Sequence, residues 1–175
     1  MRTLIGRSSR VLLMVAAFSI ASLVGVAQER DRTKIPDKYK WNLADLYPTE
    51  EAWKKAKEKI VADIPSVEQY KGSLSSSPQK LLACLTLTSN LTKEFSRISS
   101  YASMLSDQDT KNSANLAMTQ EMSQIGSTFA AKASFIEPEI LKIDKATIDG
   151  FVKSEKGLAI YQHYLDDILR RQAHT

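Results

Sequence analysis

Few side chains in this chain could bind a metal or activate a water molecule. Its only histidines are His163 and His174, and it lacks an HExxH motif, which would place two imidazoles and a general base on one helix face. His163 and Asp167 stand four residues apart and could share such a face. Because zinc sites in proteins use three or four ligands, this pair predicts an ordinary solvated helix face.

Paired carboxylates and a nucleophilic thiol are the other chemistries to consider. Glu137 and Glu139 flank Pro138, but no third group accompanies them, and we interpret them as helix-end residues. Cys84 is the only cysteine, so it forms no intrachain disulfide. It falls on an apolar helix face without a nearby cation, where burial raises the pKa of a thiol and makes it unreactive.

Further motifs of catalysis or binding are missing as well. The sequence contains no serine, histidine and aspartate set and no glycine-rich phosphate loop. Met104, Met118 and Met122 could form an adaptable peptide-binding surface, but their helical spacing within an apolar stripe is typical of a core. We therefore predict that this chain supplies no catalytic, cofactor-binding or metal-binding residue.

The longest regular pattern in the chain runs from Ser77 to Ile136. Apolar or small side chains recur there at steps of three and four residues, which predicts two amphipathic helices, each roughly 40 Å long. Residues 106–109 are rich in side chains that bond their own backbone, so we expect the turn there and antiparallel helices on either side. The two stripes are Leu81, Cys84, Thr88, Leu91, Phe95, Ile98, Ala102 and Leu105, then Ala114, Met118, Met122, Ile125, Phe129, Ala133 and Ile136.

Shorter helices are expected on both sides of this hairpin. A first helix runs from its cap Thr49 to Asp63. Pro138 interrupts the second long helix, Asp144 caps a short helix, and a last helix starts near Gly157. Strand-like alternation of useful length is absent, so we predict an all-α fold: a long antiparallel helical hairpin with additional shorter helices.

An aromatic segment precedes the first helix. Residues 35–48 hold three aromatic side chains and several aliphatic ones, without a helical period. We expect an extended segment packed on the helices, with Trp41 and Tyr47 as its anchors. The alternative is an aromatic patch that binds a ligand.

The N-terminal residues resemble an export signal. Arg2, Arg7 and Arg10 precede an apolar run over 11–27, and small residues at its end predict cleavage after Ala27. A retained membrane anchor is the alternative, but the run is shorter than the ~20 strongly apolar residues that span a bilayer. We therefore expect a signal peptide over 1–27, no stable membrane anchor after cleavage, and a periplasmic or extracellular protein.

Composition and charge indicate the kind of protein and exclude one class of partner. A 175-residue chain with 43% hydrophobic and 25% charged residues is one domain or part of one. The formal net charge is +4, but without the three signal arginines 21 of the 24 basic residues remain against 20 acidic ones. With no basic cluster that includes aromatic residues, we expect no nucleic-acid partner. We expect a flexible leader over 28–34 and a helical region over 35–175.

Several segments occur in the order and spacing of one family. Together they resemble the opening of oligoendopeptidase F, a zinc metallopeptidase related to thimet oligopeptidase, and they cover nearly all of 35–175. They are IPDKYKWNLADLYP at 35–48, YKG at 70–72, YA at 101–102, SFIEPEIL at 134–141 and YQHYLDDILRRQAHT at 161–175.

The resemblance implies a non-catalytic N-terminal region of an enzyme that cuts short peptides inside an enclosed channel. In that family two HExxH histidines and a later glutamate hold zinc, and the motif's own glutamate activates water. All of them lie in the C-terminal catalytic part, so none is carried onto this sequence. We interpret the chain as a truncated or partial product. The export signal departs from the many family members that look cytosolic.

Two hypotheses follow. In the first, the chain is part of the wall of the substrate channel of an exported zinc metalloendopeptidase, meets short peptides only within the full enzyme, and has the catalytic region as its missing partner. Alone, it would neither cleave peptides nor bind zinc tightly. In the second, it is a stand-alone exported helical module that binds a partner without catalysis.

Overall fold

The computed structural model describes residues 34–171. The predicted signal peptide over 1–27 lies outside the described residues, as do positions 28–33 of the predicted leader and His174. The chain divides into two compact units, Met1–Lys40 and Trp41–Thr175. In the first unit the described residues form the short 3-10 helix η2 (Asp37–Tyr39), where Lys40 Nζ lies 3.0 Å from an Asp37 carboxylate oxygen.

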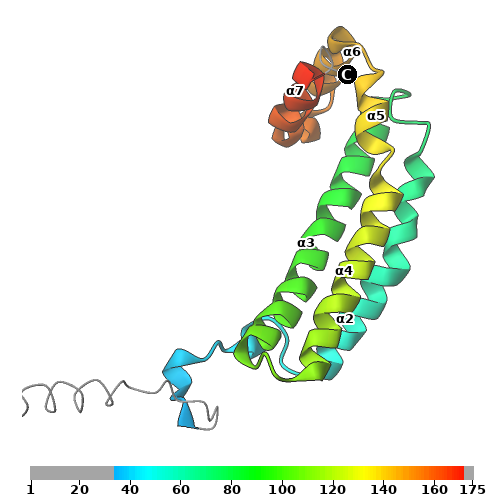
Figure 1. Ribbon diagram of the computed structural model, residues 1–175. Coiled ribbons are helices and arrows are strands. Elements are labelled where there is room, and N and C mark those ends of the chain that lie inside the picture. Colours follow the sequence, from blue (N-terminus) through cyan, green and yellow to red (C-terminus); the bar gives the residue numbers. More distant parts are fainter. Residues whose placement is uncertain (1–33, 172–175) are drawn as a thin grey trace, which may run out of the picture. The chain divides into compact units, whose positions relative to one another are not determined.

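The second unit is built on three helices that lie side by side (Figure 1). They are α2 (Glu50–Asp63), α3 (Pro78–Gln108) and α4 (Ser113–Ala133). The 3-10 helices η3 (Leu43–Asp45) and η4 (Ile64–Tyr70) precede and follow α2. α3 and α4 form the antiparallel hairpin expected from the sequence. At 1.5 Å per residue their lengths are about 46 and 32 Å, so the arms are less equal than predicted.

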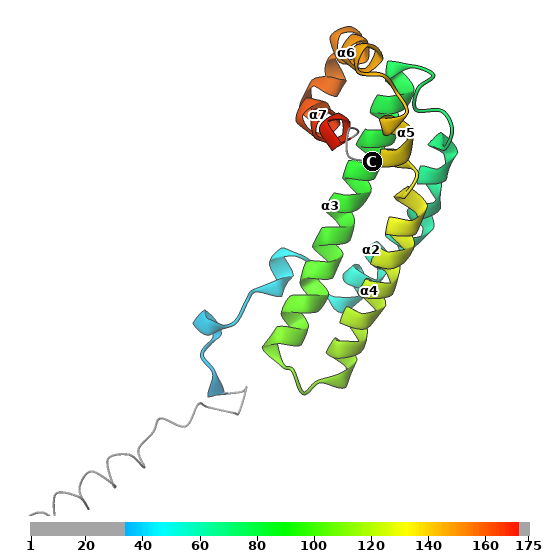
Figure 2. The ribbon, with the colours of Figure 1, turned by 45° about the horizontal axis from the view of Figure 1, so that its top comes forward.

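Four shorter elements gather at the end of the bundle where α3 begins and α4 ends (Figure 2). They are α5 (Ile136–Leu141), α6 (Lys145–Ser154), η5 (Lys156–Tyr161) and α7 (Gln162–Arg171). Every regular element within 34–171 is a helix, which confirms the all-α prediction. Among these residues no helix is both long and apolar enough to span a bilayer.

Local capping explains why several helices begin where the sequence predicts. The Thr49 hydroxyl accepts a hydrogen bond from the backbone N–H of Ala52 at 3.1 Å. The Ser77 hydroxyl accepts one from the backbone N–H of Lys80 at 3.2 Å. Both donors belong to the third residue of their helix. Asp144 does the same for Thr147 at 2.9 Å. Each bond satisfies an N–H that has no partner within its helix.

The hairpin turn and the last helix differ from the predictions. α3 continues through 106–108, and Asn112 caps α4 by accepting from the backbone N–H of Ala114 and Asn115. The turn therefore lies at 109–112, because no residue before Asp109 breaks the helix and Asn112 offers a better cap. Near Gly157 the chain first forms the 3-10 helix η5, and α7 begins only at Gln162.

The core runs along the hairpin and continues under the shorter helices. Most of the predicted stripe positions are buried or half-buried, but Ala114 is exposed because it lies in the first turn of α4, next to the loop. The largest side chains that are almost completely buried are Trp53, Ile64, Leu74, Leu81, Ile98, Ile140, Ile148, Leu158, Leu165 and Ile168.

The aromatic segment before α2 is anchored by one of the two residues predicted. Tyr47 is buried and meets the Tyr101 ring edge to face, with ring centroids 5.6 Å apart. Trp41 is 51% exposed, so its assignment as an anchor was wrong. Its backbone carbonyl, rather than its ring, is held, because Gln108 Nε2 donates to it at 3.0 Å.

A tight turn after η4 joins two segments that are distant in sequence. Gly72 has φ +78°, a conformation that L side chains rarely adopt. Its backbone N–H donates to Glu139 Oε1 of α5 at 2.5 Å. The YKG and SFIEPEIL segments therefore meet in space.

Two glycine replacements test this turn. Gly72→Ala should lower the free energy of unfolding by about 1–2 kcal/mol, because alanine is strained at positive φ. Gly150→Ala is the matched control, since Gly150 lies inside α6 with no atom within 4 Å of an added Cβ. It should raise stability by about 0.5–1 kcal/mol. Urea denaturation measures the free energy of unfolding of both variants. If the two replacements changed it equally, an alanine side chain would cause no strain at position 72.

Candidate binding surface

His163 and Asp167, the pair considered as possible zinc ligands, both lie on α7. Asp167, on α7, is paired with Arg170 and also lies 3.5 Å from Arg171 Nε. The hydrogen bond from Arg170 holds the pKa of the Asp167 carboxyl below its usual range. His163 is exposed. Across 34–171, no three histidine, cysteine or acidic side chains are grouped so that they could hold a metal ion. The described residues therefore do not fit a zinc site.

Glu137 and Glu139 act separately, each on a different segment. Glu137 accepts a hydrogen bond from Arg171 of α7 at 3.3 Å, while Glu139 holds the Gly72 turn. These contacts tie α5 to its two neighbours in space. The two helix-end carboxylates therefore make structural contacts in the described chain and do not converge on one site.

Cys84 lies in the core of the bundle. Its side chain is fully buried, and burial raises the pKa of the thiol to about 11. The neighbouring Thr88 hydroxyl donates to the Cys84 carbonyl at 2.9 Å. Because only the thiolate is nucleophilic, we expect this residue to be unreactive in the folded chain.

The Cys84 thiol gives a direct measure of this burial. We expect it to react with a maleimide at neutral pH at least about a hundredfold more slowly in the folded chain than in denaturant, since both exposure and thiolate fraction are lost on folding. The pKa shift also predicts that stability falls as the pH rises from about 9 towards 11, because the folded state then binds the proton more tightly than the unfolded state. Rapid labelling of the native protein would contradict the buried position.

The methionines do not form an exposed surface. Met122 is buried, while Met104 and Met118 are half-buried. Met118 also packs against the core. The structure confirms the core assignment for Met122 and Met118, while Met104 is half-buried.

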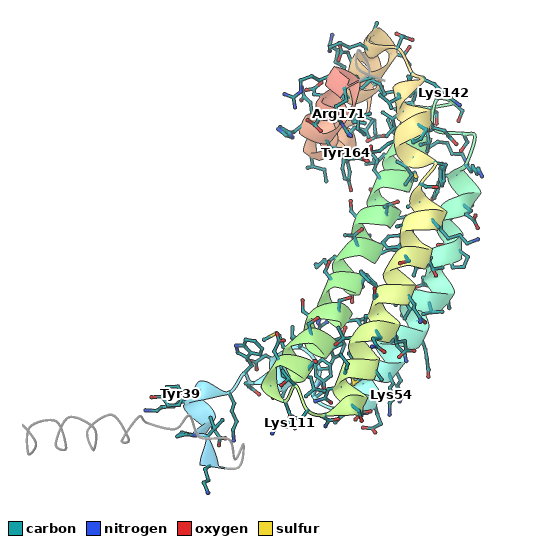
Figure 3. All side chains as sticks on the ribbon, in the orientation of Figure 1. Tyr39, Lys54, Lys111, Lys142, Tyr164 and Arg171 are labelled. Atoms are coloured by element: carbon teal, nitrogen blue, oxygen red, sulfur yellow. The ribbon has the colours of Figure 1, made fainter. Side chains whose placement is uncertain are left out.

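The surface is instead hollowed beside α7, around Tyr164. Two adjoining hollows of about 550 and 490 Å³ share Thr88, Ile136 and Tyr164. We call them together the Tyr164 groove. Figure 3 shows Tyr164 on α7 at the side that faces the bundle. The other lining residues are Leu85, Ser89, Thr92 and Lys93 of α3, Tyr161 of η5, and Ala130, Ala133, Ser134, Glu137 and Pro138 from the end of α4 and α5.

The groove combines an apolar floor with few charges. Ile136 and Leu85 are buried beneath it, and Tyr164 keeps 37% of its surface exposed. Burial and the nearby Glu137 carboxylate raise the pKa of the Tyr164 phenol, against an opposing effect of Arg171. The ring is therefore neutral at physiological pH, and the groove can take apolar side chains but holds no group set for catalysis.

Local sequence patterns did not indicate this groove. Tyr161 ends η5, and the exposed Tyr164 lies next to the buried Leu165 of α7. The groove arises from the way α7 packs against α5 while leaving part of α3 uncovered.

Comparisons with a family model and with curated proteins find similar proteins of one kind. A family model described as Oligopeptidase F matches residues 139–175. Oligopeptidase PepF of Bacillus subtilis is 29% identical over 158 residues, which are 87% of this chain and 24% of that protein. Group B oligopeptidase PepB of Streptococcus agalactiae is 26% identical over 83% of this chain and 24% of its own length.

Solved structures agree with these sequence matches. Oligoendopeptidase-F from Enterococcus faecium superposes with a TM-score of 0.66 at 25% identity, over 72% of this chain and 25% of that one. The chain is similar to the N-terminal region of oligoendopeptidase F. A putative peptidase from Chlamydophila abortus matches with a TM-score of 0.69 at 25% identity, over 85% of this chain and 25% of that one. The chain thus spans about a quarter of the length of its oligoendopeptidase F relatives.

Proposed function

We propose that this chain is the N-terminal, non-catalytic region of an exported zinc metalloendopeptidase that hydrolyses short peptides. In this proposal its helices form part of the wall of the substrate channel, and the zinc ligands and the water-activating glutamate lie outside the chain. The observation that carries the proposal is the extent of the match: 87% of this chain aligns with 24% of the Bacillus subtilis oligopeptidase.

The chemistry of the described residues is compatible with this division of labour. They fit no zinc site, Glu139 holds the Gly72 turn, and the one described thiol is buried. Zinc would therefore have to be held by the region that the relatives possess and this chain does not span. A metal there would supply Lewis-acid activation of water.

The role in a channel wall is supported by the surface of the second unit. Long helices packed side by side provide a stiff partition, and large apolar side chains remain partly uncovered on several of its elements. These exposed residues are Trp41, Val61, Leu116, Ile160 and Tyr164. A region that packs against a larger catalytic part would use such positions for contact.

The proposal is tested by the DNA downstream of the codon for Thr175. We expect an open reading frame that continues in frame and encodes HExxH within a few hundred codons. The complete product should cleave short peptides and lose that activity with a chelator, whereas the 175-residue chain alone should show neither activity nor tight zinc binding. An immediate stop codon would favour the stand-alone module, and chelator-sensitive cleavage by the short chain would contradict the division of labour.

Export is tested separately. We expect the mature protein to start at Gln28, because small residues at positions 25–27 suit a signal peptidase. N-terminal sequencing of protein from the periplasmic and culture fractions measures this. Recovery of intact Met1 in the cytosolic fraction alone would count against export.

A further inference from the structure

The Tyr164 groove has the properties of an uncovered helix-packing site. Its floor is made by Leu85 and Ile136, which are buried, and Tyr164 covers them only in part. On the α3 wall Ser89 and Thr92 are short and exposed. Short side chains at this spacing let a second helix approach α3 closely. The groove is therefore shaped for an apolar helical stripe.

The charges at its borders specify the occupant further. Glu137 is already paired with Arg171 of α7. Lys93, at the α3 border, has no ion-pair partner among residues 34–171. An acidic side chain that enters beside Lys93 would be favoured, while a second cation would be repelled.

The length of the relatives indicates where such a helix comes from. About three quarters of each relative lies outside the part that this chain matches, and α7, the last described helix, forms one wall of the groove. We infer that the Tyr164 groove is the docking site for a helix of the catalytic region, which places apolar side chains on Tyr164 and a carboxylate opposite Lys93. This inference rests on the proposed function.

The inference is tested by comparing how fast an introduced cysteine reacts in two proteins. One is the product of the complete reading frame, and the other is the 175-residue chain. Thr92→Cys places a thiol in the groove, and Ala62→Cys places a control thiol on the exposed side of α2. Cys84 is a poor competitor because it is buried with a pKa of about 11. Maleimide labelling, followed by peptide mapping, gives the rate at each position.

We expect Thr92→Cys to react at least about tenfold more slowly in the complete protein than in the 175-residue chain, with no such difference for Ala62→Cys. Adding Lys93→Glu should restore much of the labelling rate, because the charge opposite the docked carboxylate is reversed. Lys55→Glu, at an exposed lysine on α2, is the charge-matched control and should leave the protection intact.

The other outcomes separate this inference from the proposed function. Equal labelling of Thr92→Cys in both forms, in a complete protein that cleaves peptides, would overturn the docking site and leave the proposed function standing. Protection that requires added substrate peptide would make a peptide the occupant. Protection in the short chain that grows with its concentration would make a second copy the occupant. A reading frame that ends at Thr175 would overturn both.

Discussion

Replacing Trp53 by alanine should lower the free energy of unfolding of the 175-residue chain by about 3–5 kcal/mol. The indole is 1% exposed, and its Nε1–H donates to the Ile98 carbonyl at 3.0 Å. It also stacks on the Tyr101 ring with centroids 6.1 Å apart. The substitution opens a cavity between α2 and α3 and removes a buried hydrogen bond, so both losses act in the same direction.

Trp41 provides the matched control for this experiment. It is the other tryptophan of the chain, and it is 51% exposed. Trp41→Ala should change stability by no more than about 0.5 kcal/mol. Urea denaturation followed by circular dichroism measures both variants without relying on the fluorescence that each one loses. Equal effects of the two replacements would contradict the burial of Trp53 against α3.

A second large effect is expected at the opposite end of the bundle. Leu165 of α7 is completely buried, beside Ile148 and Val152 of α6. Leu165→Ala should destabilise the chain by about 2–5 kcal/mol, because it removes three buried carbon atoms from the contact that holds α7 in place. Since α7 also forms a wall of the Tyr164 groove, loosening it should open the groove as well.

Ile160 of η5 is the control for this site. It is 80% exposed, so Ile160→Ala should leave the free energy of unfolding within about 0.5 kcal/mol of the parent chain. Hydrogen exchange of the α7 amides reports the local consequence: faster exchange is expected for Leu165→Ala and unchanged exchange for Ile160→Ala. Undiminished protection of α7 in the Leu165 variant would show that other contacts hold this helix.

The helical architecture could be predicted because it depends on neighbours along the chain. Steps of three and four residues set the buried faces of α3 and α4, and Thr49, Ser77 and Asp144 cap helices through bonds that span three residues. The resemblance to oligoendopeptidase F rested on short ordered segments, and the comparisons bear it out. The same reasoning correctly assigned Cys84 to the core.

Contacts between distant segments decided the rest. Nothing local distinguishes Trp41 from Tyr47, and only the packing of η3 and α2 against α3 buries one and exposes the other. The bond between Gly72 and Glu139 spans 67 residues, and the Tyr164 groove needs α3, α5 and α7 together.

By itself the sequence determined which faces must be buried, since periodicity is a local property. The tertiary structure alone decided which of those faces stay uncovered, because that depends on how many neighbours each face meets.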